Sequence, residues 1–177
     1  MTRFLSTVND DVDKLKMGMT WLLTCRGIPQ LYYGTEILMN GVSNTDGWVR
    51  LDFKGGWEGD VPNKFTKEGR SEQEEEVFAL TSRLGNFRKN ASAIKTGKFM
   101  QYIPDNGLYV YFRYDAKQTV MCVMNTSDKP LTVDFSKYTE RINGFSKAIS
   151  ITDNKEYETG NTASIVAKSM WVMELKK

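Results

Sequence analysis

Apolar residues recur at helical spacing in residues 10–26. The apolar positions are Val12, Leu15, Met19, Leu22 and Leu23. Residues three or four positions apart lie on the same side of a helix, so the pattern predicts an amphipathic helix. Asp10 is suited to its N-cap, and Gly27 to the turn after its last residue.

A second helix is predicted to follow Ser71. Ser71 and Glu74 have the spacing of a capping box, in which each side chain binds the backbone N–H of the other residue. The apolar stripe of this helix continues at Val77, Leu80, Leu84 and Phe87. We expect the helix to end near Asn90.

A short apolar run and a long irregular segment lie between the two helices. The run Ile28–Tyr33 predicts a short buried strand closed by Gly34, as in the helix-to-strand connections of a parallel sheet. Residues 34–70 have no convincing periodicity and contain Trp48 and Trp57. A loop of this length is usually functional or disordered, and its tryptophans argue against disorder.

Beyond residue 95 the apolar pattern changes to a period of two. Turn residues separate the runs, as in Pro104–Gly107 and Thr126–Pro130. The predicted strands are Lys98–Ile103, Leu108–Tyr114, Thr119–Met124, Leu131–Phe135, Ala148–Thr152, Ala163–Ala167 and Met170–Leu175. Several short strands with frequent turns favour an antiparallel sandwich.

The sandwich can close a core alone, but the N-terminal half cannot. A lone parallel-type strand at Ile28–Tyr33 needs strand neighbours on both sides, and the chain offers none. We therefore expect this half to be part of something larger. Its uncovered apolar faces predict a homo-oligomer or a domain-swapped dimer.

Composition excludes several classes of function. The 177 residues carry 24 Lys and Arg against 22 Asp and Glu, a net charge of +2, so no field favours nucleic acid or an anionic membrane. No run is apolar and long enough to predict a membrane span. Met1–Phe4 lacks the charged start and apolar core of a signal peptide, and the cellular location stays open.

The chain has no histidine, which excludes a Ser–His or Cys–His nucleophile pair and a His-ligated metal within it. Cys25 and Cys122 lie far apart in apolar runs, so we expect buried thiols rather than a disulfide. No cofactor or metal is expected.

Several segments together resemble one enzyme family. Gly27–Glu36 is similar to the eighth-strand motif of the α-amylase family, glycoside hydrolase family thirteen. Thr2–Phe4 resembles the segment that follows strand seven there, and Asn86–Asn90 the end of the last barrel helix. Leu108–Arg113 and Val120–Asn125 resemble the opening strands of the C-terminal sandwich. The neopullulanase and cyclomaltodextrinase branches are the most similar.

The resemblance implies an α+β fragment made of the last helix–strand–helix of a (β/α)8 TIM barrel and an all-β antiparallel sandwich. Residues 1–92 would be the terminal barrel segment, with helix 7, strand 8, a long loop and helix 8. Residues 93–177 would form the C-terminal sandwich domain.

The resemblance also implies retaining hydrolysis of α-1,4-glucans such as starch, pullulan and cyclodextrins. That chemistry needs two carboxyl groups about 5–5.5 Å apart. In the family they belong to strands four and five, and a further Asp belongs to an Asn-His-Asp triplet that would stand directly before Met1. We therefore expect no catalytic residues in this chain and no activity of the chain alone. The alternative is a non-catalytic carbohydrate-binding or interaction module that uses the sandwich and the loop tryptophans.

Three residues of the long loop are candidates for substrate binding: Trp48, Trp57 and Arg50. Flat indole faces suit the C–H surfaces of a sugar ring, although both tryptophans could equally fasten the loop onto a barrel. Asp46 and Arg50 resemble the acid and arginine after strand eight in the family. An ion pair that holds the loop is the simpler account of these two residues.

The remaining conspicuous residues have structural interpretations. Glu36 is a lone carboxylate and is expected to anchor the loop. The acids Asp46, Asp52, Glu58 and Asp60 match no EF-hand spacing, so we expect solvated loop acids. Core positions are expected for Trp21 and Trp171. Cross-strand packing is expected for Tyr102, Tyr109, Tyr111 and Tyr114.

Overall fold

A computed structural model describes residues 2–177 of the chain. The chain divides into two compact units. Unit 1 comprises the residues up to Lys16 together with Pro29–Ser82, and unit 2 comprises Met17–Ile28 together with Arg83–Lys177. None of the helices in the described part of the chain is both long enough and apolar enough to span a bilayer.

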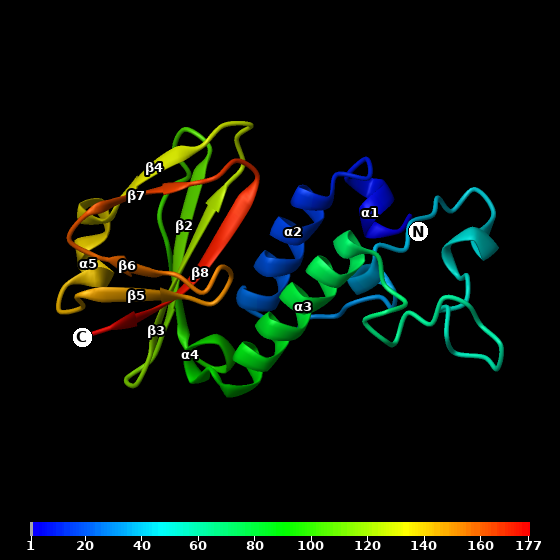
Figure 1. Cartoon of the computed structure of the whole chain (residues 1–177). Coiled ribbons are helices and arrows are strands. Elements are labelled where there is room, and N and C mark those ends of the chain that lie inside the picture. The colour runs from blue at the N-terminus through cyan, green and yellow to red at the C-terminus, as the bar shows by residue number, and fades with distance from the viewer. Residues whose placement is uncertain (1) are drawn as a thin grey trace. The chain divides into compact units, whose positions relative to one another are not determined.

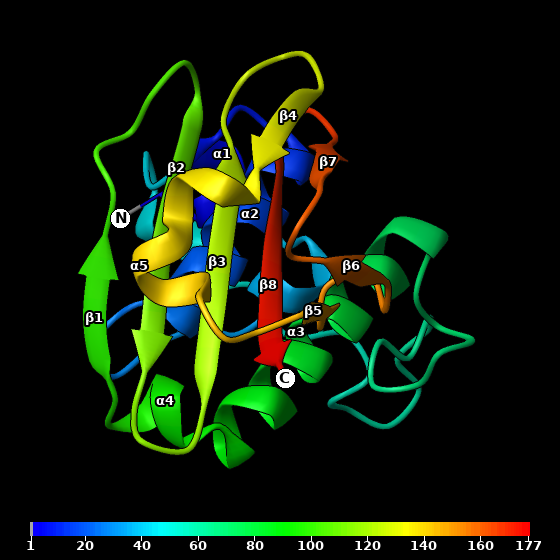
Figure 2. The same ribbon diagram turned by 90° about the vertical axis from the view of Figure 1, so that its left-hand side faces the viewer.

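Unit 2 contains a β-sandwich of eight strands (Figures 1 and 2). One sheet has six strands in the order β1-β2-β3-β8-β5-β6, the other pairs β4 with β7, and every ladder is antiparallel. The strands are β1 (Lys98–Gln101), β2 (Leu108–Tyr114), β3 (Thr119–Asn125), β4 (Leu131–Asp134), β5 (Lys147–Ser150), β6 (Glu156–Glu158), β7 (Thr162–Ile165) and β8 (Ser169–Lys176). The predicted sandwich is confirmed.

Side chains from both sheets form the core of unit 2. Val133 on β4 and Ile165 on β7 pack with Phe112, Met121 and other residues of the large sheet. The 3₁₀ helix η3 (Phe135–Tyr138) and the short helix α5 (Thr139–Ile142) close the same core. Figure 2 shows α5 in front of the large sheet, over β2 and β3.

The apolar pattern of the sequence predicted seven of the eight strands. It missed β6, Glu156–Glu158, because two of its three residues are charged and exposed and it gains order only by pairing with β5. It also missed η3 and α5, which are single turns too short to show a helical period.

The predicted strand Ile28–Tyr33 is wrong, because these residues adopt no regular secondary structure and Ile28 is 97% exposed. A strand forms only when neighbours accept and donate its ladder hydrogen bonds. Here the carbonyl of Tyr33 accepts from Arg3 Nη1 and that of Tyr32 from Thr35 Oγ1. Side-chain donors therefore take the place of a ladder at these two carbonyls.

Both long helices are confirmed, as α2 (Val12–Thr24) and α3 (Glu72–Asn90). The predicted N-cap of α2 is off by one residue, because Asp11 Oδ1 accepts from the backbone N–H of Lys14 while Asp10 lies at φ 55°. The remaining helical turns are α1 (Phe4–Thr7), η1 (Thr35–Ile37), η2 (Asp46–Val49) and α4 (Ser92–Lys95).

The start of α3 is a complete capping box. Ser71 N–H donates to Glu74 Oε2 over 2.6 Å, and Glu74 N–H donates to Ser71 Oγ over 3.3 Å. Lys64 Nζ also donates to Glu74 Oε2, at 2.5 Å. One carboxylate therefore satisfies a free helix donor and ties the preceding loop to the helix.

Two arginines donate hydrogen bonds to the carbonyl groups at the C-terminal end of α2. Arg88 on α3 donates to the carbonyls of Leu23 and Gly27, over 2.8 and 2.6 Å. Arg113 on β2 donates to the carbonyls of Thr24 and Cys25 and to that of Gly97. Arg113 is only 2% exposed, so these carbonyls replace the water that its guanidinium loses.

Both cysteines are free thiols, as expected. Cys122 is fully buried on β3, whereas Cys25 is half-buried just after α2. Burial raises the pKa of the Cys122 thiol to about 12, against the opposing effect of its hydrogen bonds with Tyr111 and Thr24. The Cys122 side chain therefore stays protonated at neutral pH.

Ser71→Ala removes one half of the capping box. We expect a loss of about 1 kcal/mol in the free energy of unfolding, because the N–H of Glu74 loses its acceptor. Urea unfolding followed by circular dichroism measures this loss. Ser43→Ala in the long loop is the control and should change the stability by much less; equal losses would contradict the role of the cap.

Glu74→Gln tests the charge of the same carboxylate. Burial raises the pKa of Glu74, but the hydrogen bonds from Lys64 and Ser71 outweigh it and lower this pKa below the ordinary 4.5. The charged form therefore stabilises the fold above pH 4.5, and this stabilisation is lost as the pH falls through the lowered pKa.

We expect the urea midpoints of the wild-type chain and Glu74→Gln to differ at neutral pH and to converge in acid. Glu72→Gln, at an exposed glutamate in the same helical turn, should give a smaller difference. A gap between wild-type and Glu74→Gln that is constant with pH would refute this account.

Candidate functional site

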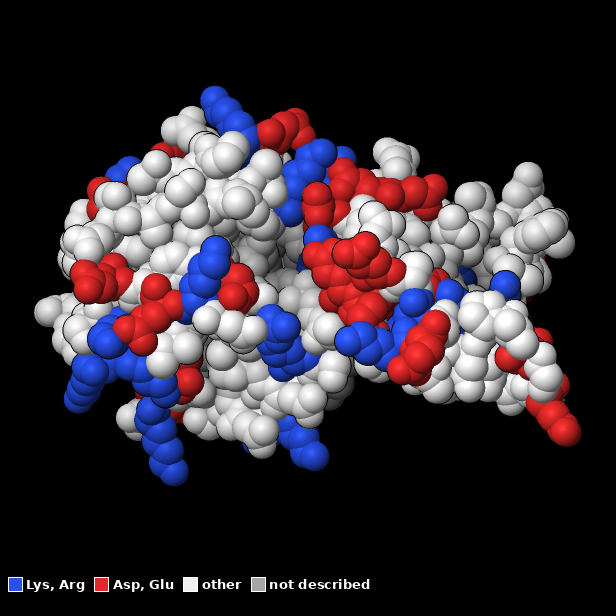
Figure 3. Space-filling view, in the orientation of Figure 1, with Lys and Arg blue, Asp and Glu red and all other residues white. Residues whose placement is uncertain are grey.

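The long loop of unit 1 exposes large apolar side chains. Trp48 is 62% exposed and Trp57 is 70% exposed. Further exposed apolar residues of the loop are Val42, Leu51, Val61 and Phe65. In Figure 3 much of the surface over this segment is white, with charged side chains scattered across it. Exposed tryptophans in a loop that keeps an ordered path are a candidate binding surface.

Local contacts hold the two tryptophans in place. Trp48 lies on η2, which is anchored by Val49, a side chain only 5% exposed. Trp57 lies in a turn organised by Asp60, whose Oδ2 accepts from the backbone N–H of Gly55 at 2.9 Å and of Trp57 at 3.2 Å. The backbone is therefore fixed while both indoles face solvent.

Arg50 forms an ion pair with Asp46, with 2.6 Å between Nη2 and Oδ2. The ion pair expected from the sequence is thus confirmed. Both side chains are 66% exposed, so the pair adds little to stability. The guanidinium of Arg50 remains open to solvent.

The acids of the loop do not form a metal centre. Among the residues that the structure describes, no three His, Cys, Asp or Glu side chains come close enough together to hold a metal ion. Glu36 lies half-buried on η1. Asp60 organises a turn and Asp46 pairs with Arg50, so two of the loop acids have structural partners.

The expectations for the other aromatic residues are met in part. Trp171 is 5% exposed, and its ring centroid lies 4.7 Å from that of Tyr157. Trp21, expected in the core, is 42% exposed. This prediction is wrong because Trp21 lies on the side of α2 that faces solvent. Tyr111 on β2 stacks on Phe99 of β1 with ring centroids 5.3 Å apart, which is cross-strand packing, whereas its tilted contact with Tyr109 lies within β2.

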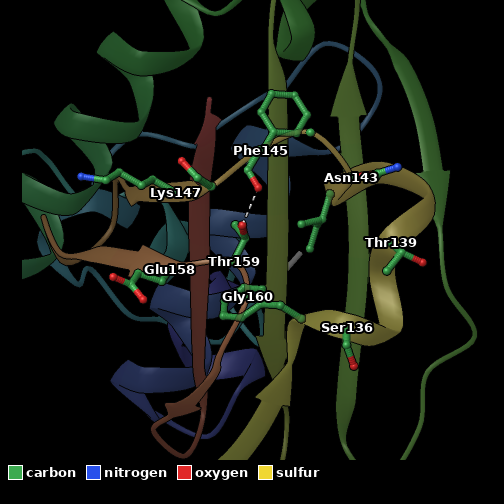
Figure 4. Close-up of a pocket in the computed structure, with 12 residues that line it drawn as sticks. Ser136, Thr139, Asn143, Phe145, Lys147, Glu158, Thr159 and Gly160 are labelled. Atoms are coloured by element: carbon green, nitrogen blue, oxygen red, sulfur yellow. Dashed lines mark hydrogen bonds between the residues drawn. The ribbon is translucent and has the colours of Figure 1, made fainter.

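The sandwich of unit 2 carries a separate pocket of about 550 Å³ (Figure 4). Residues of η3 and α5, among them Ser136 and Thr139, line one side, and residues of β5 and β6 line the other. Thr159 Oγ1 donates to the carbonyl of Phe145 at 2.7 Å, which is the dashed line in Figure 4. In that view Lys147 points away from the centre, so neutral groups dominate the wall.

Sequence reasoning missed this pocket. The elements around it are single turns and short strands that join only in the folded sandwich, and no motif marks them. The paired turn residues Asn143-Gly144 and Thr159-Gly160 were the available signal, since Gly144 takes φ 88°.

Comparisons with known proteins agree with the fold. Residues 99–174 match the model of the cyclo-malto-dextrinase C-terminal domain. A cyclomaltodextrin glucanotransferase of Geobacillus stearothermophilus is 26% identical over 175 residues, which covers 94% of this chain and 21% of that protein. A cyclomaltodextrinase of Thermoanaerobacter pseudethanolicus is 25% identical over 127 residues, covering 72% of this chain and 20% of that protein.

A similar solved structure is an α-amylase from Geobacillus thermoleovorans in complex with acarbose. Its TM-score is 0.76 at 19% identity, and the match covers 100% of this chain and 37% of that one. This chain therefore spans about a fifth of the two sequence relatives and little more than a third of the α-amylase. The chain is thus similar to the C-terminal portion of α-amylase family (glycoside hydrolase family 13) proteins of the neopullulanase and cyclomaltodextrinase type.

Proposed function

We propose that this chain is the C-terminal part of a retaining glycoside hydrolase that acts on α-1,4-glucans such as starch, pullulan and cyclodextrins. The observation that carries the proposal is the similarity over 94% of the chain to a cyclomaltodextrin glucanotransferase. The fold match to an α-amylase over the whole chain supports it.

In this proposal residues 1–92 are the end of a (β/α)8 barrel and residues 93–177 are its C-terminal sandwich. The helices α2 and α3 would be barrel helices 7 and 8. The segment Ile28–Tyr33 would become strand eight only when neighbouring barrel strands supply its ladder. The exposure of Ile28 and Tyr32, at 97% and 46%, supports a partner of this kind.

The chain alone is proposed to be inactive. Retaining chemistry needs a nucleophile and an acid/base carboxyl about 5–5.5 Å apart on either side of the scissile bond. Several acids of unit 1 are instead occupied by structure: Asp46 with Arg50, Asp60 in its turn, Glu74 in the capping box and Glu75 with Arg70. These roles support the absence of a catalytic pair within the chain.

The purified 177-residue chain is therefore expected to release no reducing sugar from soluble starch, pullulan or β-cyclodextrin above a buffer blank. A full-length cyclomaltodextrinase assayed in parallel shows that the assay works. Hydrolysis that follows the chain through two chromatographic steps, and that disappears from a mock purification, would overturn the proposed inactivity.

A second candidate function is carbohydrate binding without catalysis. The exposure of Trp48 and Trp57, on a loop whose backbone is held by Asp60 and by the buried Val49, favours it. Indole faces can stack on glucose rings, and the open guanidinium of Arg50 can donate to sugar hydroxyls. The loop would then bind glucan whether or not a barrel is present.

Trp48→Ala and Trp57→Ala are each expected to weaken maltoheptaose binding by roughly two- to tenfold, the scale of one aromatic contact. Isothermal titration calorimetry measures the affinity. Trp21→Ala is the matched control, since it removes an exposed tryptophan outside the loop and should leave binding unchanged. Heats that never exceed dilution for the wild-type chain would eliminate this function.

Partners follow from the same proposals. An α-glucan is the proposed ligand of the whole enzyme, with no nucleic acid and no membrane. The homo-oligomer or domain-swapped dimer expected through barrel-facing surfaces stays a prediction.

A further inference from the structure

Arg3 of unit 1 is a buried cation without a counter-ion. Its side chain is 4% exposed, and none of the ion pairs formed within residues 2–177 includes it. Its backbone is anchored, because Arg3 N–H donates to the carbonyl of Gly41 and its carbonyl accepts from Thr7. An arginine keeps its charge at any physiological pH, so the fold holds a permanent charge at this point.

One nitrogen of the guanidinium has an acceptor, and two tyrosine rings lie against the group. Nη1 donates to the carbonyl of Tyr33 over 2.7 Å. The rings of Tyr32 and Tyr33 lie over the guanidinium, each with its centroid 4.8 Å from Cζ. Aromatic faces attract the cation, but they accept no hydrogen bond in the guanidinium plane.

The other edge of the guanidinium is empty. Nε and Nη2 are buried and have no acceptor among the described residues. Their N–H bonds lie side by side on one edge, and a carboxylate can accept both at once with its two oxygens. This is the strongest hydrogen-bonding arrangement that an arginine offers, and Arg3 leaves it unused.

Arg70, in the same unit, has the carboxylate partner that Arg3 lacks. Its guanidinium lies 3.9 Å from the ring centroid of Phe78, and its Nη1 donates to the carbonyl of Lys64. Its Nε donates to Glu75 Oε2 at 2.6 Å. Ring, backbone carbonyl and carboxylate thus surround Arg70, whereas Arg3 has only the ring and the carbonyl.

Arg113, in unit 2, shows how a buried arginine manages without a carboxylate. Both of its terminal nitrogens donate to backbone carbonyls, and only Nε lacks an acceptor. Arg113 therefore has no complete empty edge. Among these three buried arginines, Arg3 alone keeps a two-donor edge open.

We propose that the Nε/Nη2 edge of Arg3 is a binding site for a carboxylate group. The carboxylate is either that of a small organic acid or that of an Asp or Glu side chain on another polypeptide, and both present the same two oxygens. Tyr32 and Tyr33 are 46% and 39% exposed, so the wall of the site reaches the surface. This inference is independent of glucan binding or hydrolysis by the chain.

The test follows the Nε–H resonance of Arg3 in ¹⁵N-labelled chain by NMR, with acetate as the probe. We expect a downfield shift that saturates with sodium acetate and is absent with sodium chloride at equal ionic strength. Arg3→Lys assigns the signal and keeps the charge without the two-donor edge. If Arg3→Lys does not fold, the comparison of acetate with chloride on the unaltered chain still shows whether the Nε–H signal responds to a carboxylate.

Three controls accompany the titration. The Nε–H signals of Arg70 and Arg113 should not respond to acetate, because the first already has a carboxylate and the second has no open edge. Arg50→Lys, at an exposed arginine of unit 1, should leave the Arg3 response unchanged.

A series of protein concentrations without acetate distinguishes the two sources. A saturable acetate shift that is independent of protein concentration supports a small organic acid. A shift that grows with protein concentration and is competed by acetate supports an Asp or Glu side chain of a second copy. An Arg3 signal that responds to neither acetate nor protein concentration overturns the proposal.

Discussion

The carbonyl groups at the C-terminal end of α2 set the main constraint on unit 2. A helix leaves its last carbonyls without partners, and burying them unpaired is costly. Arg88 from α3 and Arg113 from β2 both donate to this end of the helix. Positive charge there also offsets the negative end of the helix dipole. The same contacts therefore satisfy the helix and join it to α3 and to the large sheet.

This constraint explains why the central strands of the large sheet, β2, β3 and β8, are buried on both faces. Four consecutive residues of β2, Val110–Arg113, are buried. Phe112 faces the core shared with β4 and β7, while Tyr111 lies 2.5 Å from Thr24 at the end of α2, from Oη to Oγ1. A sandwich sheet with one solvent face would show strict alternation instead. The polar atoms of Thr24, Tyr111 and Arg113 let a helix end pack on that second face.

The long loop of unit 1 uses charged side chains for local order and leaves both of its tryptophans exposed. The carboxylates of Asp60, Glu74 and Glu75 each accept hydrogen bonds from backbone or side-chain donors of the loop and of the start of α3. Trp48 and Trp57 gain no burial from this order. A loop that is ordered by polar contacts and exposes indoles is suited to a ligand or to a further part of a protein, which are the two functions proposed.

Most of what the sequence by itself determined depends on residues close together in the chain. The capping box of Ser71 and Glu74, the two long helices and seven strands follow from neighbours within a few positions, and so does the pair of Asp46 with Arg50. The candidate site was predicted only in part. The sequence singled out Trp48, Trp57 and Arg50, but it could not predict that these side chains are exposed.

Tertiary structure decided whatever depends on a distant partner. Ile28–Tyr33 has the composition of a strand, yet none of the residues 2–177 forms a ladder with it. The position of Trp21 in a predicted helix suggested a core residue. Only the packing of α2 decides which face of the helix is covered. The empty edge of Arg3 and the pocket beside Thr159 exist because residues far apart in sequence meet, and no local pattern carries that information.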